Sequence, residues 1–164
     1  MANVKNNLGV MQGRLVKKYM GRYQAHPINY WKDEFHLAKK LGLDCIEFIL
    51  DYNDYNENPL LTKNGIEQIQ SISGESGVEI KTICADYFMD APIHSLDFKV
   101  VAQSRKVLLK LINNAAKLGV TDIVIPCVDN SSIDESSSSI FVKQLSEVLE
   151  VAENKKINLS LETD

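Results

Sequence analysis

Residues 157–162 read Ile-Asn-Leu-Ser-Leu-Glu, a regular alternation of aliphatic and polar side chains. Successive side chains of a β-strand point to opposite faces, so Leu159 and Leu161 share one face while Ser160 and Glu162 share the other. A parallel strand covered by helices on both sides would be apolar on both faces. The alternation therefore favours a strand with helices on one face and a polar interior on the other, as in a (β/α)₈ barrel.

Four similar apolar runs precede this one, and amphipathic segments separate them. The five predicted strands cover residues 8–12, 45–50, 79–86, 121–126 and 157–162. The four predicted helices lie around residues 31–41, 62–73, 98–118 and 141–154. Gly42, Gly77 and Gly119 can take the left-handed conformation that ends the first three helices, and Asn154 can do so for the fourth. The order is βαβαβαβαβ, which predicts parallel strands with right-handed crossovers.

Two architectures contain this order: an open, doubly wound sheet and the first half of a (β/α)₈ barrel. Glu47 lies between Ile46 and Phe48, where a carboxylate facing a layer of helices would need a partner. The chain also stops directly after the fifth strand, without a helix to cover it. We predict one domain over residues 1–164. It would be the N-terminal five strands and four helices of a (β/α)₈ barrel, truncated after strand five, with strand order 1-2-3-4-5 and helices on the outer side only.

Composition excludes several classes of function. Hydrophobic residues make up 45% and charged residues 24%, as in an ordinary globular domain with a core. The net charge of −4 provides no basic footprint for nucleic acid or an anionic membrane. No apolar run approaches the ~20 residues of a membrane span, and no signal peptide is visible. Cys45, Cys84 and Cys127 are far apart and odd in number, so we interpret them as reduced residues of a cytoplasmic protein.

Polar residues mark the carboxyl end of every predicted strand, where barrel enzymes build their active sites. They are Gln12, Asp51, Asp86, Asp129 and Glu162. Aspartate is also common after strands because it caps helices and turns, and that structural role is favoured for Asp51, Asp129 and Asp164. Glu162 continues an inward polar face, which favours a metal ligand or a base. For Asp86 and Glu47 the structural and functional interpretations are balanced.

Four segments resemble the sugar phosphate isomerase/epimerase family, one of the xylose-isomerase-like barrels, which also include DNA-repair endonucleases. They are LGVMQGRL (8–15), LGLDCIEF (41–48), CADYFM (84–89) and LSLETD (159–164). The resemblance implies a divalent cation, manganese first, with magnesium, cobalt or zinc as alternatives. Carboxylates and a histidine at the ends of strands five to eight would bind it. Glu162 matches the first of these ligands and would also be the catalytic carboxylate; the other ligands would lie beyond Asp164.

The resemblance further implies a small sugar or sugar phosphate as substrate, isomerised or epimerised by proton transfer beside a carbonyl. Gln12 and Arg14 are candidates to contact its hydroxyl or phosphate groups, and Arg14 is equally a solvated loop charge. Glu47 and Asp86 are further substrate-binding candidates, as is His26, expected near the rim. Nucleic acid and membranes are not expected partners, and homo-oligomer formation is left open. We expect the 164-residue chain alone to be inactive and prone to self-association.

Several alternatives stay open. An endonuclease-IV-like, metal-dependent repair nuclease would use histidines at earlier strand ends and basic side chains for DNA, whereas aspartates and a negative charge occur here. A receiver-type module would need an acidic pair after strand one and a lysine after strand five. A flavodoxin-like module would need a Ser/Thr/Gly phosphate loop in place of residues 12–15. A barrel that only binds carbohydrate fits the same residues.

Overall fold

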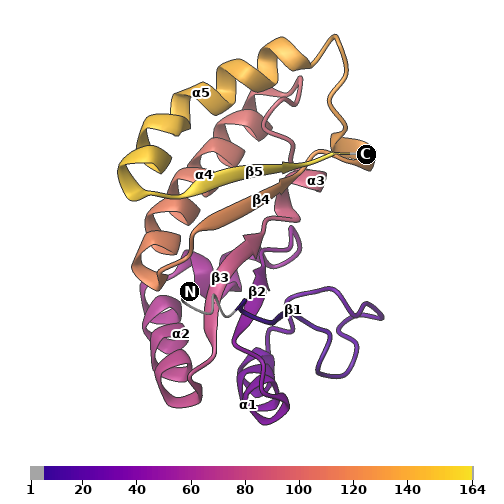
Figure 1. The fold of residues 1–164 in the computed structure, drawn as a ribbon. Coiled ribbons are helices and arrows are strands. Elements are labelled where there is room, and N and C mark those ends of the chain that lie inside the picture. The colour runs from indigo at the N-terminus through magenta and orange to yellow at the C-terminus, as the bar shows by residue number, and fades with distance from the viewer. Residues whose placement is uncertain (1–5, 164) are drawn as a thin grey trace.

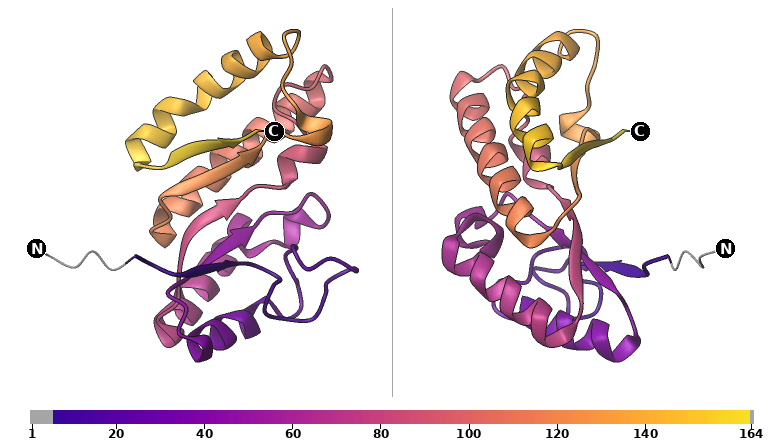
Figure 2. Two further views of the ribbon diagram at one scale, coloured as in Figure 1. Left: turned by 45° about the vertical axis from the view of Figure 1, so that its right-hand side comes forward. Right: turned by 60° about the vertical axis from the view of Figure 1, so that its left-hand side comes forward.

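The computed structural model describes residues 6–163, which form one parallel sheet in the order β1-β2-β3-β4-β5. Its strands are β1 (Gly9–Met11), β2 (Cys45–Ile49), β3 (Glu79–Cys84), β4 (Asp122–Pro126) and β5 (Asn158–Glu162). The long helices are α1 (Trp31–Leu41), α2 (Lys63–Ser76), α4 (Phe98–Leu118) and α5 (Ser138–Lys155), and the short α3 (Tyr87–Asp90) follows β3. The long helices all lie on one face of the sheet (Figures 1 and 2). The predicted strand order and one-sided cover are therefore confirmed.

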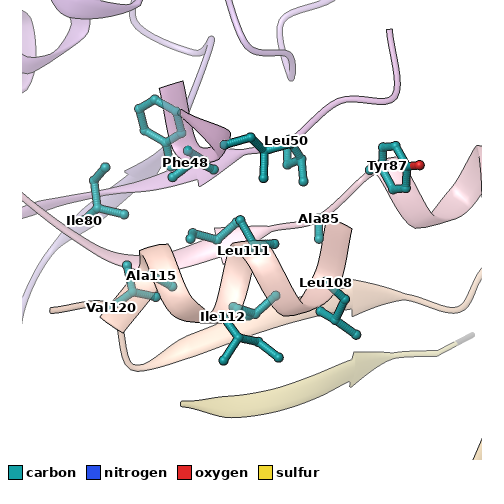
Figure 3. Close-up of a cluster of buried hydrophobic side chains, with 14 of the residues drawn as sticks. Phe48, Leu50, Ile80, Ala85, Tyr87, Leu108, Leu111, Ile112, Ala115 and Val120 are labelled. Carbon is teal, nitrogen blue, oxygen red and sulfur yellow. The ribbon is translucent and has the colours of Figure 1, made fainter. Parts of the chain in front are cut away.

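The hydrophobic core fills the space between the sheet and the helices. Figure 3 shows Phe48 of β2 and Ile80 of β3 on the side of the sheet where α4 places Leu111 and Ala115. All four side chains are at most 2% exposed. Burial of such a side chain contributes about 1.5–3 kcal/mol, so this single apolar layer provides the main stabilisation.

The opposite, inner face carries the polar members of the alternation. The core includes Ile46 and Phe48 but not Glu47, which lies between them and is half-buried. On β5, Leu159 packs against the core while Ser160 is half-buried. Leu161 departs from expectation because it is 44% exposed: the described helices cover the start of β5 and leave its end open. The inner face therefore offers polar groups along its whole width.

The helix ends follow the predicted glycines in three of four cases. Gly42, Gly77 and Gly119 adopt φ values of 75°, 73° and 74° and close α1, α2 and α4. The prediction for Asn154 was wrong, because α5 continues to Lys155 and Lys156 takes the left-handed cap with φ 57°. In this register the Ile157 N–H donates to the carbonyl of Ala152 at 3.0 Å, and Ile157 is 5% exposed. Burial of Ile157 thus outweighs the preference of asparagine for the cap.

No helix in the described part of the chain combines the length and the apolar character that a membrane span requires.

A long loop between β1 and α1 folds back onto the first turn of α1. Gly13 opens this loop with φ +88°, and a Cβ atom there would lie 2.2 Å from the carbonyl oxygen of Tyr23. Glu34 of α1 is fully buried, and its Oε1 accepts the N–H groups of Gly13 (2.7 Å) and Leu15 (3.2 Å). Its Oε2 is buried without a hydrogen-bond partner among residues 6–163. Burial raises the pKa of Glu34, although the two backbone N–H groups act in the opposite direction.

We expect Glu34→Gln to change how stability depends on pH. Because the folded state raises the pKa of Glu34, the protonated carboxyl favours folding. Its contribution is complete below the ordinary value of 4.5 and is lost as the pH rises through the folded pKa. The free energy of unfolding of the wild type should therefore fall relative to that of Glu34→Gln as the pH rises above about 4.5. Urea unfolding followed by circular dichroism measures this difference.

Two further variants separate charge from hydrogen bonding. Asp33→Asn removes an exposed carboxylate from the same helical turn and controls for surface charge. Glu34→Ala leaves two backbone N–H groups without their acceptor and should cost about 1–3 kcal/mol even at low pH. A difference between wild type and Glu34→Gln that stays constant over the whole range would contradict this assignment.

Candidate functional site

A pocket of about 440 Å³ opens where β2, β3 and β4 end. In Figure 1 this is the end of the sheet where α3 and the long loop after β1 gather. Its lining is mostly polar. The lining residues are Arg22, Asp51, Tyr52, Asn53, Asp86, Met89, Asp90, Asp129 and Asn130.

Arg22 reaches the pocket through a tight turn in the β1–α1 loop. The N–H groups of Tyr19 and Arg22 each donate to the carbonyl of the other residue at 2.9 Å. Met20 and Gly21 between them have φ values of 49° and 81°, the positive pair that a type I′ turn requires. The guanidinium of Arg22 then meets Asp51, with 2.9 Å between Nη2 and Oδ1.

Asp51 holds the loop at a second point. Its side chain is 8% exposed, and its Oδ2 accepts the backbone N–H of His26 at 2.7 Å. Both carboxylate oxygens are thus used to fix the loop against the end of β2. Sequence reasoning favoured a structural role for Asp51, and these contacts give it one while also placing it in the pocket wall.

Gln12 and His26 form a buried pair beneath the loop. Gln12 Oε1 accepts the N–H of Ile49 at 3.0 Å and lies 3.1 Å from His26 Nδ1. Because the Ile49 N–H fixes Oε1 as an acceptor, Nδ1 must carry the imidazole proton. Burial lowers the pKa of His26 to about 3, so the ring is neutral.

His26 therefore does not lie at the rim, where the sequence predicted it. Its side chain is 3% exposed, and its ring centroid lies 5.3 Å from Phe48 and 6.3 Å from Trp31. The physical reason is that Asp51 binds the backbone N–H of His26 and the side chain of Arg22. These contacts turn the loop inward and place the imidazole in the core. Trp31 and Phe35, in the first turns of α1, are core residues.

Asp86 is the predicted site residue that lines the pocket. It is half-buried just beyond β3, and its Oδ1 accepts a hydrogen bond from the thiol of Cys84 at 3.0 Å. Burial raises the pKa of Asp86; the nearby charges of Asp51 and Glu162 act in the same direction, and Arg22 acts against them. Burial also raises the pKa of the Cys84 thiol, so Cys84 is a protonated donor and not a nucleophile.

The other predicted residues surround the pocket without lining it. Glu162 is exposed at the end of β5 and close enough to Asp86 to influence its charge. Glu47 lies on the inner face beside Met11 and Thr82. Arg14 is exposed and donates to Gln24 Oε1 at 3.3 Å. Asp164 lies outside the described residues.

Sequence reasoning missed the residues that loops bring in. Arg22 has no local signal beyond the Met-Gly turn before it. Tyr52 lies in an irregular segment after β2, and Asp90 ends the short helix α3 after β3. Asp129 had been identified by its position after a strand, with a structural role favoured. Its place in the pocket wall shows that the strand-end rule located it well.

A complete metal centre does not form within residues 6–163. No three histidine, cysteine, aspartate or glutamate side chains of this segment come together in a way that could hold a metal ion. The carboxylates of Glu162 and Asp86 are the oxygen donors that a hard divalent cation prefers, but they are too few to hold one alone.

Comparison with known proteins places this geometry in a family. The sequence profile described as "Xylose isomerase-like TIM barrel" matches residues 35–164. The L-ribulose-5-phosphate 3-epimerase UlaE of Escherichia coli (strain SMS-3-5 / SECEC) is 26% identical over 136 residues, covering 80% of this chain and 48% of the relative.

Solved structures show the same fold at low sequence identity. The 3-keto-D-glucoside 4-epimerase YcjR from E. coli superposes with a TM-score of 0.68 and 17% identity, over 96% of this chain and 56% of that one. An L-ribulose 3-epimerase gives 0.66 and 18%, over 96% and 49%. The chain thus spans about half the length of the relatives it matches. On this match, and with its five parallel strands under one layer of helices, the chain belongs to the xylose isomerase-like TIM barrel family.

Proposed function

We propose that the protein epimerises or isomerises a sugar or sugar phosphate by proton transfer beside a carbonyl group. One observation carries this proposal: carboxylates and a guanidinium converge in a polar pocket at the carboxyl ends of the strands. This is where barrel enzymes of every chemistry place their reacting groups. The names of the relatives support a sugar as the substrate.

The reaction requires two groups that exchange a proton with carbon. In our proposal Glu162 removes the proton from the carbon beside the carbonyl, and the C–H electron pair passes into an enediolate. A second acid returns a proton to the opposite face for epimerisation, or to the neighbouring carbon for isomerisation. In isomerisation the hydroxyl proton of the enediolate also passes to the other oxygen, so that the carbonyl forms on the carbon that lost its proton. Asp86 is suited to hold a proton at this site because burial raises its pKa.

The other predicted residues take supporting roles in this proposal. Gln12 and His26 position the loop that carries Arg22. Glu47 would contact substrate from the inner face and Arg14 from the loop.

A divalent cation, manganese first, with magnesium, cobalt or zinc as alternatives, is part of the proposal and would act as a Lewis acid toward the sugar oxygens. Glu162 would be one of its ligands. Since residues 6–163 do not complete a centre, none of the steps above depends on it. We also propose a cytoplasmic location, from the composition. The acidic pocket disfavours the nuclease alternative, because a DNA backbone requires cationic contacts.

We expect Glu162→Gln, introduced into protein with epimerase turnover, to reduce kcat by about 10²–10⁴-fold, the usual contribution of a general acid or base. The amide keeps the shape and hydrogen bonding of the carboxylate but cannot accept a proton from carbon. Metal binding should weaken. The melting temperature of the metal-free protein should stay the same or rise slightly, because one of several neighbouring negative charges is removed.

Glu153→Gln, an exposed carboxylate near the end of α5, is the matched control. Normal turnover and metal content in Glu162→Gln would show that Glu162 is not catalytic. A large fall in melting temperature by calorimetry would show instead that Glu162 supports the fold.

A further inference from the structure

Tyr52 stands at the rim of the pocket with an accessible ring. It is 43% exposed and lines the polar pocket. It also lines a second, mostly apolar groove of about 200 Å³, whose other lining residues are Tyr87, Ala91, Lys99, Val100 and Gln103. The ring of Tyr52 therefore separates a polar space from an apolar one.

The ring is supported by the core. Its centroid lies 5.4 Å from that of Tyr87, and it stacks on Tyr55 at 6.4 Å with 23° between the planes. Tyr87 is itself 1% exposed, and its N–H donates to the carbonyl of Leu50 at 2.7 Å. Figure 3 shows Tyr87 at the edge of the hydrophobic cluster. An exposed aromatic ring on so rigid a base is a suitable surface for the C–H face of a sugar ring or chain.

The charge of the pocket favours an uncharged ligand. Among the described lining residues, Arg22 is the only cation, and its ion pair with Asp51 uses that charge. Asp86, Asp90 and Asp129 add three carboxyl groups to the lining, and of these Asp86 is close enough to Arg22 for the guanidinium to oppose the rise in its pKa. Carboxylates accept hydrogen bonds from sugar hydroxyl groups, but they repel a phosphate dianion.

The other cations of the β1–α1 loop do not line the pocket. The Nζ atom of Lys17 lies 5.0 Å from the ring centroid of Tyr30, and that of Lys18 lies 4.4 Å from the ring of Tyr23. These contacts hold both ammonium groups on the loop itself. Neither ammonium group therefore lines the pocket, and Arg14, the remaining cation of the loop, is exposed outside it.

The relatives include both an L-ribulose 3-epimerase and an L-ribulose-5-phosphate 3-epimerase, so family membership leaves the substrate class undecided. We propose that this pocket takes an unphosphorylated ketose, stacked on Tyr52, with its hydroxyl groups bonded to the carboxylates and to Arg22. This inference rests on the proposed function of the same site and adds the class of sugar and the residue that orients it.

Binding of a matched pair of sugars tests the class. Amide chemical shifts of the ¹⁵N-labelled chain would be followed in EDTA-containing buffer during titration with L-ribulose or with L-ribulose 5-phosphate. We expect L-ribulose to bind at least about tenfold more tightly, since the carboxylates of Asp90 and Asp129 repel the dianion. The preference for L-ribulose over its phosphate should become smaller when salt is added, and it should also be smaller in the Asp129→Asn variant.

Equal or tighter binding of the phosphate would overturn the inference, as would shifts from neither sugar. This outcome is separate from the test of the proposed function. If turnover depends on Glu162 but the protein binds the phosphate more tightly, the proposed function stands and only the unphosphorylated substrate class is wrong.

The role of Tyr52 is tested by two substitutions in the same titration. Tyr52→Phe keeps the ring and should bind L-ribulose within about twofold of wild type, whereas Tyr52→Leu keeps apolar bulk without the ring and should bind about fivefold to tenfold more weakly. Phe98→Leu changes an aromatic residue that is 88% exposed at the start of α4 and lines neither the pocket nor the groove, and it should bind as wild type does. Urea unfolding confirms that each variant is folded. Wild-type affinity in Tyr52→Leu, or an equal loss in Phe98→Leu, would show that Tyr52 is not the sugar platform.

Discussion

The contact between the apolar face of the sheet and its helices decides where every other group in this protein can lie. Phe48 and Ile80 are buried under the helices, and the alternation of a β-strand then forces their neighbours to the opposite face. Glu47 and Ser160 reach the inner face for this reason alone. A shift of one residue in any strand would exchange the two sets, at the cost of burying carboxylates. The position of the site is thus a consequence of the core.

The buried carboxylates of Glu34 and Asp51 fix the position of the β1–α1 loop. Glu34 binds the start of the β1–α1 loop through two backbone N–H groups. Asp51 binds the middle of the loop through the backbone of His26 and through the side chain of Arg22. Each carboxylate accepts two hydrogen bonds across a large gap in sequence, so the loop is fixed although it has almost no regular structure. Its rigidity lets a residue from the loop take part in a pocket built by strand ends.

Carboxylates in this fold differ in role because their surroundings differ. Asp51 is satisfied by an ion pair and a backbone N–H, whereas Asp86 accepts a hydrogen bond from a thiol and has a raised pKa. Glu162 stands exposed at the end of β5. The three carboxyl groups therefore differ: Asp51 is held in an ion pair, Asp86 has a raised affinity for a proton, and Glu162 is open to solvent. A site that must both bind hydroxyl groups and exchange protons with carbon requires such differences.

The sequence by itself determined the fold class and the polar, inward side of strands two and five, because both follow from periodicity over a few residues. The polar face of strand five, the inward side of Glu47 and three glycine caps were all predicted from such local patterns. Strand-end position also located Asp86 and Asp129 in the pocket wall.

Only the tertiary structure decided what loops contribute. Arg22 meets a carboxylate 29 residues away, and His26 enters the core instead of the rim. The cap of α5 moved from Asn154 to Lys156 because Ile157 is buried there. In each case the outcome depends on packing between segments distant in sequence, which local propensity does not encode.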